Sequence, residues 1–159
     1  HGIWSFSFVR DPVARLYSAW NNKVIENPDP GAGLRALGVR PGMRFEAFAA
    51  CIAESPDAGA DVHVRSQSAI LVLGGRVLPS FIGRVETMAQ DWAHLRHEVR
   101  LRGGPDLGPI SHRNRRAGAR PELADTLPPA TLAAIRARYL EDFRRFYPER
   151  LAAIEARLP

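Results

Sequence analysis

The feature that most restricts the fold is a short apolar segment followed at once by a helix-start signal. Residues 3–9 (Ile-Trp-Ser-Phe-Ser-Phe-Val) are almost all apolar or small, which is typical of a strand buried on both faces of a parallel sheet. Arg10 ends this segment, and Asp11 and Pro12 follow it. Aspartate is a favoured N-cap residue, and proline at the first helical position gives up no hydrogen bond that the helix needs. The segment therefore predicts a strand, a sharp turn and a helix.

The predicted helix has an apolar side and a polar side when successive residues are placed about 100° apart. The apolar side carries four residues at helical spacing: Val13, Leu16, Trp20 and Val24. Asp11, Arg15 and Ser18 fall on the opposite side. We therefore expect polar side chains to project away from the core, just beyond the end of the strand.

Further helices and strands alternate along the chain. In order, the pattern predicts a loop over residues 27–42, a helix over 43–53, a short helix or extended piece over 66–73, a strand over 78–85, a helix over 86–101, an irregular basic segment over 102–129, and C-terminal helices over 132–146 and 149–158. Strands that alternate with helices indicate an α/β architecture. Because two strands form a small sheet for so many helices, we expect the sheet to be partial and to lack a strand that lies upstream.

Charge and composition narrow the classes of function. The chain of 159 residues has a net charge of +5, and Lys23 is the one lysine among 22 basic residues, all the others being arginine. The arginine guanidinium grips phosphate or sulfate through two parallel hydrogen bonds, which suits an anionic ligand. The positive charge is spread along the chain rather than gathered in one segment, which argues against nucleic acid as a partner. One cysteine, Cys51, excludes an internal disulfide framework and a thiolate zinc cluster.

Residues 8–20, FVRDPVARLYSAW, carry a family resemblance. They resemble the 3′-phosphate-binding motif, FVRDPxxRLxSA, of sulfotransferases that use 3′-phosphoadenosine 5′-phosphosulfate (PAPS). Three later blocks are similar to the carbohydrate sulfotransferase branch, sulfotransferase family 2. They are DVH at residues 61–63 with Gln67, FIGRVE at residues 81–86 with the following Asp91 and Trp92, and YLEDF at residues 139–143. The likeness covers most of the chain, in the family's order. It implies an α/β, P-loop-like sulfotransferase fold with a partial parallel sheet flanked by helices.

The resemblance also implies ligands and partners. PAPS is the expected sulfuryl donor and a hydroxyl, of a carbohydrate, the expected acceptor, with no metal involved. His94 and His97 stand three residues apart on a predicted helix, but the sequence offers no third ligand for a metal beside them. No apolar run reaches the length of a membrane span. We expect a cytoplasmic location, with membrane association through a missing N-terminal part as the alternative.

By this resemblance Arg10 and Ser18 bind the 3′-phosphate of the nucleotide. A helix N-terminus favours an anion through its dipole and free backbone N–H groups, and ligands of α/β sheets bind at the carboxyl ends of strands. Ser18 lies about 9 Å along the helix from its start. Arg10 and Ser18 can therefore contact the same phosphate only if the Arg10 side chain lies along the polar face of the helix. Read alone, Ser18 is a solvated helix hydroxyl and Arg15 a structural partner of Asp11.

Two further candidates come from the later blocks. His63 is the candidate general base, because it follows a predicted break over residues 55–61, rich in Pro, Gly and Asp, and is flanked by Asp61 and Arg65 within a block similar to the family's. The alternative is a polar loop or cap histidine. Arg113 and Arg115 resemble the family's late loop, which closes over the nucleotide or contacts an anionic acceptor. The alternative is a solvated basic loop.

The family's 5′-phosphosulfate-binding loop lies upstream of the 3′-phosphate motif, and nothing in the sequence matches it. We therefore expect residues 1–159 to form a single, partial sulfotransferase domain that transfers no sulfate by itself. Truncation and loss of the segment during evolution both remain open. Two other functions also fit the sequence, a noncatalytic nucleotide- or polyanion-binding module and a basic nucleic-acid binder.

Overall fold

The structure is a computed structural model in which residues 3–110 and 123–158 are described. Short strands and helices alternate along it, in the order β1 (Phe6–Val9), α1 (Pro12–Trp20), the π-helix η1 (Asn21–Ile25), α2 (Ala32–Ala36), α3 (Phe45–Ala53), α4 (Gln67–Leu71), β2 (Val72–Leu73), β3 (Arg76–Val77), β4 (Phe81–Arg84), α5 (Met88–Leu101), α6 (Leu123–Thr126), α7 (Pro129–Arg138), α8 (Leu140–Phe146) and α9 (Pro148–Glu155). In the described part of the chain, no helix combines the length and apolar character that a membrane crossing needs.

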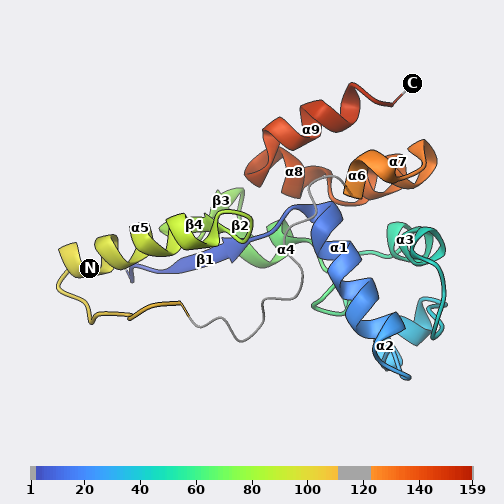
Figure 1. Cartoon of the computed structure of the whole chain (residues 1–159), viewed down its shortest axis with the longest axis horizontal. Coiled ribbons are helices and arrows are strands. Elements are labelled where there is room, and N and C mark those ends of the chain that lie inside the picture. Colours follow the sequence, from blue (N-terminus) through green and yellow to red (C-terminus); the bar gives the residue numbers. More distant parts are fainter. Residues whose placement is uncertain (1–2, 111–122, 159) are drawn as a thin grey trace.

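β1 and β4 form a two-stranded parallel sheet in which Val9 lies opposite Arg84. Figure 1 shows α5 lying along this pair, with the remaining helices gathered beyond the end of β1. Gly83 allows the two strands to close, because a Cβ atom at this position would lie 2.8 Å from Cδ1 of Phe8. The pairing confirms the predicted α/β architecture, with a small parallel sheet flanked by helices.

β2 and β3 form a separate antiparallel hairpin. Gly74 and Gly75 connect the two strands with φ values of 57° and 79°. A two-residue turn with positive φ at both positions matches the natural twist of a hairpin, and glycine adopts it without strain.

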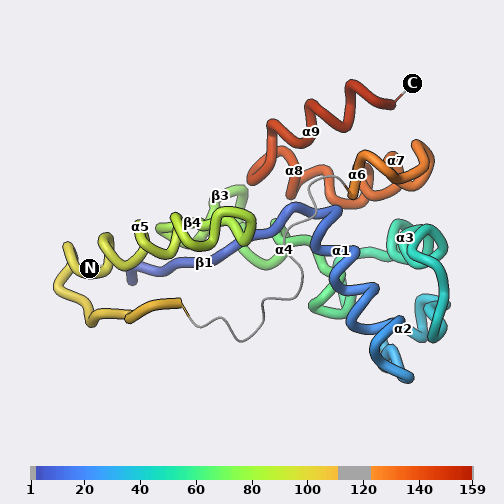
Figure 2. The backbone as a smooth tube through the Cα atoms, viewed as in Figure 1, coloured from blue at the N-terminus to red at the C-terminus, as the bar shows by residue number. Residues whose placement is uncertain are grey.

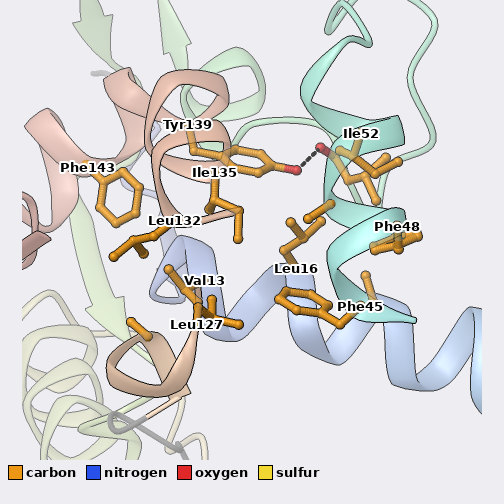
Figure 3. Close-up of a cluster of buried hydrophobic side chains, with 14 of the residues drawn as sticks. Val13, Leu16, Phe45, Phe48, Ile52, Leu127, Leu132, Ile135, Tyr139 and Phe143 are labelled. Atoms are coloured by element: carbon orange, nitrogen blue, oxygen red, sulfur yellow. Dashed lines mark hydrogen bonds between the residues drawn. The ribbon is translucent and has the colours of Figure 1, made fainter. Parts of the chain in front are cut away.

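The helices enclose one apolar core to which α1, α3, α7 and α8 each contribute. Figure 3 shows side chains from these elements pointing toward one another; among them are Val13, Leu16, Phe45, Phe48, Ile52, Leu132, Ile135 and Phe143. Tyr139 crosses the core, and its hydroxyl donates a hydrogen bond of 2.7 Å to the carbonyl oxygen of Val64 (Figure 3). The core thus fixes α1 relative to the segment that follows α3.

Three expectations about local structure are corrected. The predicted loop over residues 27–42 contains the short helix α2. Leu34 of α2 is fully buried in the core, and this burial outweighs the poor helix propensity of the surrounding glycine and proline residues. Residues 66–73 form both a helix, α4, and a strand, β2, rather than one element. The predicted irregular segment over 102–129 also holds α6.

Candidate functional site

The strand β1 runs directly into α1 (Figure 2). Arg10 and Asp11 are the two residues between them. The carboxylate of Asp11 accepts the backbone N–H of Ala14 at 2.9 Å, which confirms the predicted N-cap. The N–H of Asp11 itself donates to Oε1 of Glu86 at 2.8 Å. Carboxylates therefore already occupy these two N–H groups, whereas we expected the helix start to offer them to a phosphate. These two N–H groups are therefore not free to bind an anion.

The start of α1 is also tied to α9. Asp11 is only 9% exposed, although its helical position predicts a polar, solvated side chain. Burial raises the pKa of Asp11, and its carboxylate lies 3.3 Å from the guanidinium of Arg150. Glu86 accepts a second hydrogen bond, of 2.7 Å, from the Tyr147 hydroxyl. These residues line part of a cavity of about 360 Å³ beside the first turn of α1.

The backbone of Arg10 is held by a buried side chain, that of Gln67. The N–H of Arg10 donates to Oε1 of Gln67 at 2.8 Å, and Nε2 of Gln67 donates to the carbonyl oxygen of Arg10 at 2.9 Å. Nε of Arg10 is buried and has no hydrogen-bond partner among the described residues. A buried donor without a partner costs free energy unless something binds it. Within the described part of the chain, Nε of Arg65 and Nε of Arg138 are also buried without a partner, but Arg10 differs from them in standing at the carboxyl end of β1, a position that fits an anionic ligand.

Ser18 lies on α1 and is half-buried. It follows Arg15 by three residues, so the two side chains project from the same side of the helix. In the described residues, no hydrogen bond joins Ser18 to Arg10. The pairing of these two residues on one phosphate stays a prediction.

Arg15 fastens a turn of the chain to α1. Its Nη1 donates to the carbonyl oxygen of Arg65 at 2.6 Å, and its Nη2 donates to that of Val62 at 2.8 Å. Burial lowers the pKa of Arg15. The structural role that the sequence suggested for Arg15 is confirmed, but its partner is the 61–65 turn and not Asp11. Asp11 pairs with Arg150 instead.

His63 lies on this turn and forms a pair with Asp61. Nδ1 of His63 lies 2.7 Å from Oδ1 of Asp61, and the backbone N–H of His63 donates to the same oxygen at 2.9 Å. The His63 side chain is 46% exposed. Partial burial raises the pKa of Asp61, but the hydrogen bonds from His63 outweigh it and hold the pKa below its usual value. An ionised Asp61 keeps the proton on Nδ1, so that Nε2 carries the lone pair.

Lys23 was not singled out as a site residue by the sequence, yet it belongs to this region. Its charge also lowers the pKa of Asp61. Lys23 lies in the π-helix η1, and π-turns inside helices occur frequently at functional sites. The sequence sets Lys23 apart only by residue type, since it is the one lysine in an arginine-rich chain.

Two pairs of candidate residues remain. Arg113 and Arg115 lie outside the described residues. His94 and His97 lie on the exposed side of α5, and the described parts of the chain contain no group of three potential metal ligands.

Comparison with known proteins assigns a family to most of the chain. A family model described as "Sulfotransferase family" matches residues 3–148. No match was found to a curated protein or to a solved structure. The end of β1, the helix α1 and the 61–65 turn all lie within the matched residues.

Proposed function

The chain belongs to the sulfotransferase family, and from this premise we propose that it binds PAPS and serves the transfer of its sulfuryl group to a hydroxyl of a carbohydrate. The proposal rests mainly on the position of the Arg10 side chain. Its buried, unpartnered Nε lies at the carboxyl end of a parallel strand, where ligands of α/β sheets bind. A near-dianionic phosphate is a strong partner for such a donor.

In this proposal Arg10 and Ser18 bind the 3′-phosphate of the donor. The two side chains supply the recognition because the N–H groups of Asp11 and Ala14 are bound to carboxylates. Arg113 and Arg115 of the late basic segment are proposed to contact the nucleotide or an anionic acceptor.

The bound donor supplies the sulfuryl group. His63 is the proposed general base: its Nε2 accepts the proton of the acceptor hydroxyl while that oxygen bonds to sulfur and the electron pair of the broken S–O bond stays on the departing 5′-phosphate. Asp61 holds Nδ1 of His63, so the imidazolium that forms lies next to a carboxylate. Arg15 fixes this turn to the same helix that carries Ser18.

Nucleotide binding tests the proposal. We expect the chain to bind adenosine 3′,5′-bisphosphate more tightly than adenosine 5′-monophosphate, measured by isothermal titration calorimetry. Arg10→Ala should weaken binding of the bisphosphate about 10- to 100-fold, since a charge-assisted hydrogen bond is worth roughly 1.5–3 kcal/mol. Ser18→Ala should weaken it less, because its hydroxyl is neutral. Arg40→Ala, at an exposed position, is the matched control and should leave affinity unchanged.

Two outcomes would contradict the proposal. Equal losses in Arg10→Ala and Arg40→Ala, with a steep dependence on salt, would indicate a diffuse polyanion or nucleic-acid binder. Tight, Arg10-dependent binding of the bisphosphate without any sulfuryl transfer by the full-length protein would indicate a noncatalytic nucleotide-binding module instead.

A further inference from the structure

The side chain of Gln67 occupies a position beside β1 that a neighbouring strand would otherwise fill. Within a strand, successive residues direct their N–H and C=O groups to alternate edges. The carbonyl oxygen of Val9 accepts the N–H of Val85 on the β4 side, at 2.8 Å. The N–H and C=O of the next residue, Arg10, therefore face the opposite edge. There both are bound by the one amide group of Gln67.

Gln67 is itself held firmly by α8. Its backbone N–H donates to Oδ2 of Asp142 at 2.7 Å, and the N–H of Ser68 donates to Oδ1 at 2.6 Å. Asp142 is 1% exposed and Gln67 is 6% exposed, so neither exchanges these bonds for water at low cost. The backbone of Gln67 is thus held by α8, and its side-chain amide is held by Arg10 at the end of β1.

Both ends of the amide are used, and this determines which side chains can replace it. Oε1 accepts from Arg10 while Nε2 donates to Arg10, so only a carboxamide satisfies both backbone groups. A glutamate of the same shape keeps the acceptor but sets a carboxylate oxygen against the carbonyl oxygen of Arg10. The conformation of Arg10 at the strand-to-helix junction depends on this pair of bonds.

We propose that Gln67 is a positioning residue: by fixing the backbone of Arg10, it aims the Arg10 guanidinium at the 3′-phosphate and thereby sets the preference for 3′-phosphorylated nucleotides. The proposal rests on the proposed function. It assigns Gln67 no contact with the ligand. Its effect passes through the unpartnered Nε of Arg10.

The experiment compares two nucleotides that differ only in the 3′-phosphate. Affinities of adenosine 3′,5′-bisphosphate and adenosine 5′-monophosphate are measured by calorimetry for the wild-type chain, Gln67→Met, Gln67→Glu and the control Gln90→Met, which changes an exposed glutamine of α5. We expect Gln67→Met to weaken bisphosphate binding about 10-fold, the equivalent of one lost hydrogen bond of roughly 1.4 kcal/mol. Monophosphate binding should stay within about twofold of wild type, and Gln90→Met should change neither affinity.

A purely structural role for Gln67 gives a different pattern. General loosening of the site lowers both affinities together and leaves their ratio intact, whereas positioning lowers the ratio. In the double variant Arg10→Ala/Gln67→Met, bisphosphate binding should be no weaker than in Arg10→Ala alone, because Gln67 acts only through Arg10. If Gln67→Met fails to fold, the same comparisons are made with Gln67→Glu.

The two proposals fail in distinguishable ways. A wild-type chain that does not distinguish the two nucleotides, or an Arg10→Ala variant that binds normally, overturns the proposed function. If wild type and Arg10→Ala behave as proposed, an unchanged affinity ratio in the folded Gln67 variants overturns the positioning role alone. Additive losses in the double variant overturn it as well.

Discussion

Nη1 of Arg15 on α1 lies 2.6 Å from the carbonyl oxygen of Arg65, and this contact fastens the 61–65 turn to the helix. The second guanidinium nitrogen binds Val62, so the two carbonyl groups on either side of His63 are held by one side chain. The turn that carries the proposed base and the helix that carries Ser18 therefore behave as one unit.

Arg15→Lys should lower the free energy of unfolding by about 0.5–1.5 kcal/mol, because a single ammonium cannot bind both carbonyl oxygens and one hydrogen bond is lost. The amide of Arg65, which donates to Asp61 at 2.9 Å, should also exchange its proton faster. Urea denaturation and hydrogen exchange measure the two effects. A variant as stable as wild type, with unchanged exchange, would show that the turn holds without the clamp.

His63→Ala should lower the turnover number of the full-length protein by about 10²–10⁴-fold, the usual contribution of a general base. Asp61→Asn should lower it by at least about 10-fold, since the ring loses the carboxylate that orients it. Adenosine 3′,5′-bisphosphate affinity, measured in parallel, should hardly change in either variant. His94→Ala, on the exposed side of α5, is the control. Equal activity in the His63 and His94 variants would remove His63 from the mechanism.

Asp57 should make the stability of the chain depend on pH in acid. Partial burial raises the pKa of Asp57, but hydrogen bonds from Arg138 and Ser66 outweigh it and hold the pKa below its usual value. Because the folded pKa lies below the unfolded value of about 3.9, this stabilisation is complete above about pH 4 and is lost as pH falls through the folded pKa.

Asp57→Asn should therefore flatten the fall in the free energy of unfolding between about pH 5 and pH 2, as followed by urea denaturation at each pH. The ion pair with Arg138, 2.7 Å long, should account for most of the difference. Profiles of equal steepness for the two proteins would show that Asp57 is not linked to acid unfolding.

Gly83→Ala should cost about 1–3 kcal/mol of stability, as overpacking does in a well-packed interior. Its Cβ atom would lie 2.8 Å from Cδ1 of Phe8, and that ring is flanked by Phe81 and Trp92. Gly33→Ala is the matched control: the nearest atom to its Cβ is 3.9 Å away, so the change should stabilise α2 by about 0.4–1 kcal/mol. Thermal unfolding distinguishes the two, and equal effects would contradict the close approach at Gly83.

Asp142→Asn should lower the free energy of unfolding by about 1–3 kcal/mol, because the amide presents a donor to one of two backbone N–H groups. Those groups belong to Gln67 and Ser68. Glu141→Gln changes the neighbouring, exposed side chain, whose ion pairs with Arg144 and Arg145 are worth little. A larger loss in Glu141→Gln than in Asp142→Asn, measured by urea denaturation, would contradict the role of Asp142 in binding the first two N–H groups of α4.

Local signals in the sequence predicted the junction that positions the site. Asp11 and Pro12 indicate the start of α1, and the apolar run before them indicates β1. Both signals depend only on residues that are adjacent in the sequence. The alternation of strands and helices indicated an α/β fold, and the expected partial parallel sheet is confirmed by the pairing of β1 with β4. The short helix α2 was missed because its stability comes from burying Leu34 in a distant core, not from local propensity.

Long-range partners of polar side chains were beyond the reach of sequence patterns. Arg15 contacts a turn 47 to 50 residues away, and Gln67 contacts a strand end 57 residues away. Helical spacing suggested Asp11 as the partner of Arg15, because periodicity indicates only contacts between residues three or four apart on the same helix. A family block drew attention to Gln67, but nothing in the spacing indicated that its amide faces the backbone of Arg10.

The bonds between Gln67 and Arg10 also set a limit on how the sheet can grow. Any further strand added along that edge of β1 finds the groups of Arg10 already taken, and its ladder must stop one residue short of the junction. The side chain of Gln67 thus prevents backbone pairing from extending along this edge as far as the start of α1.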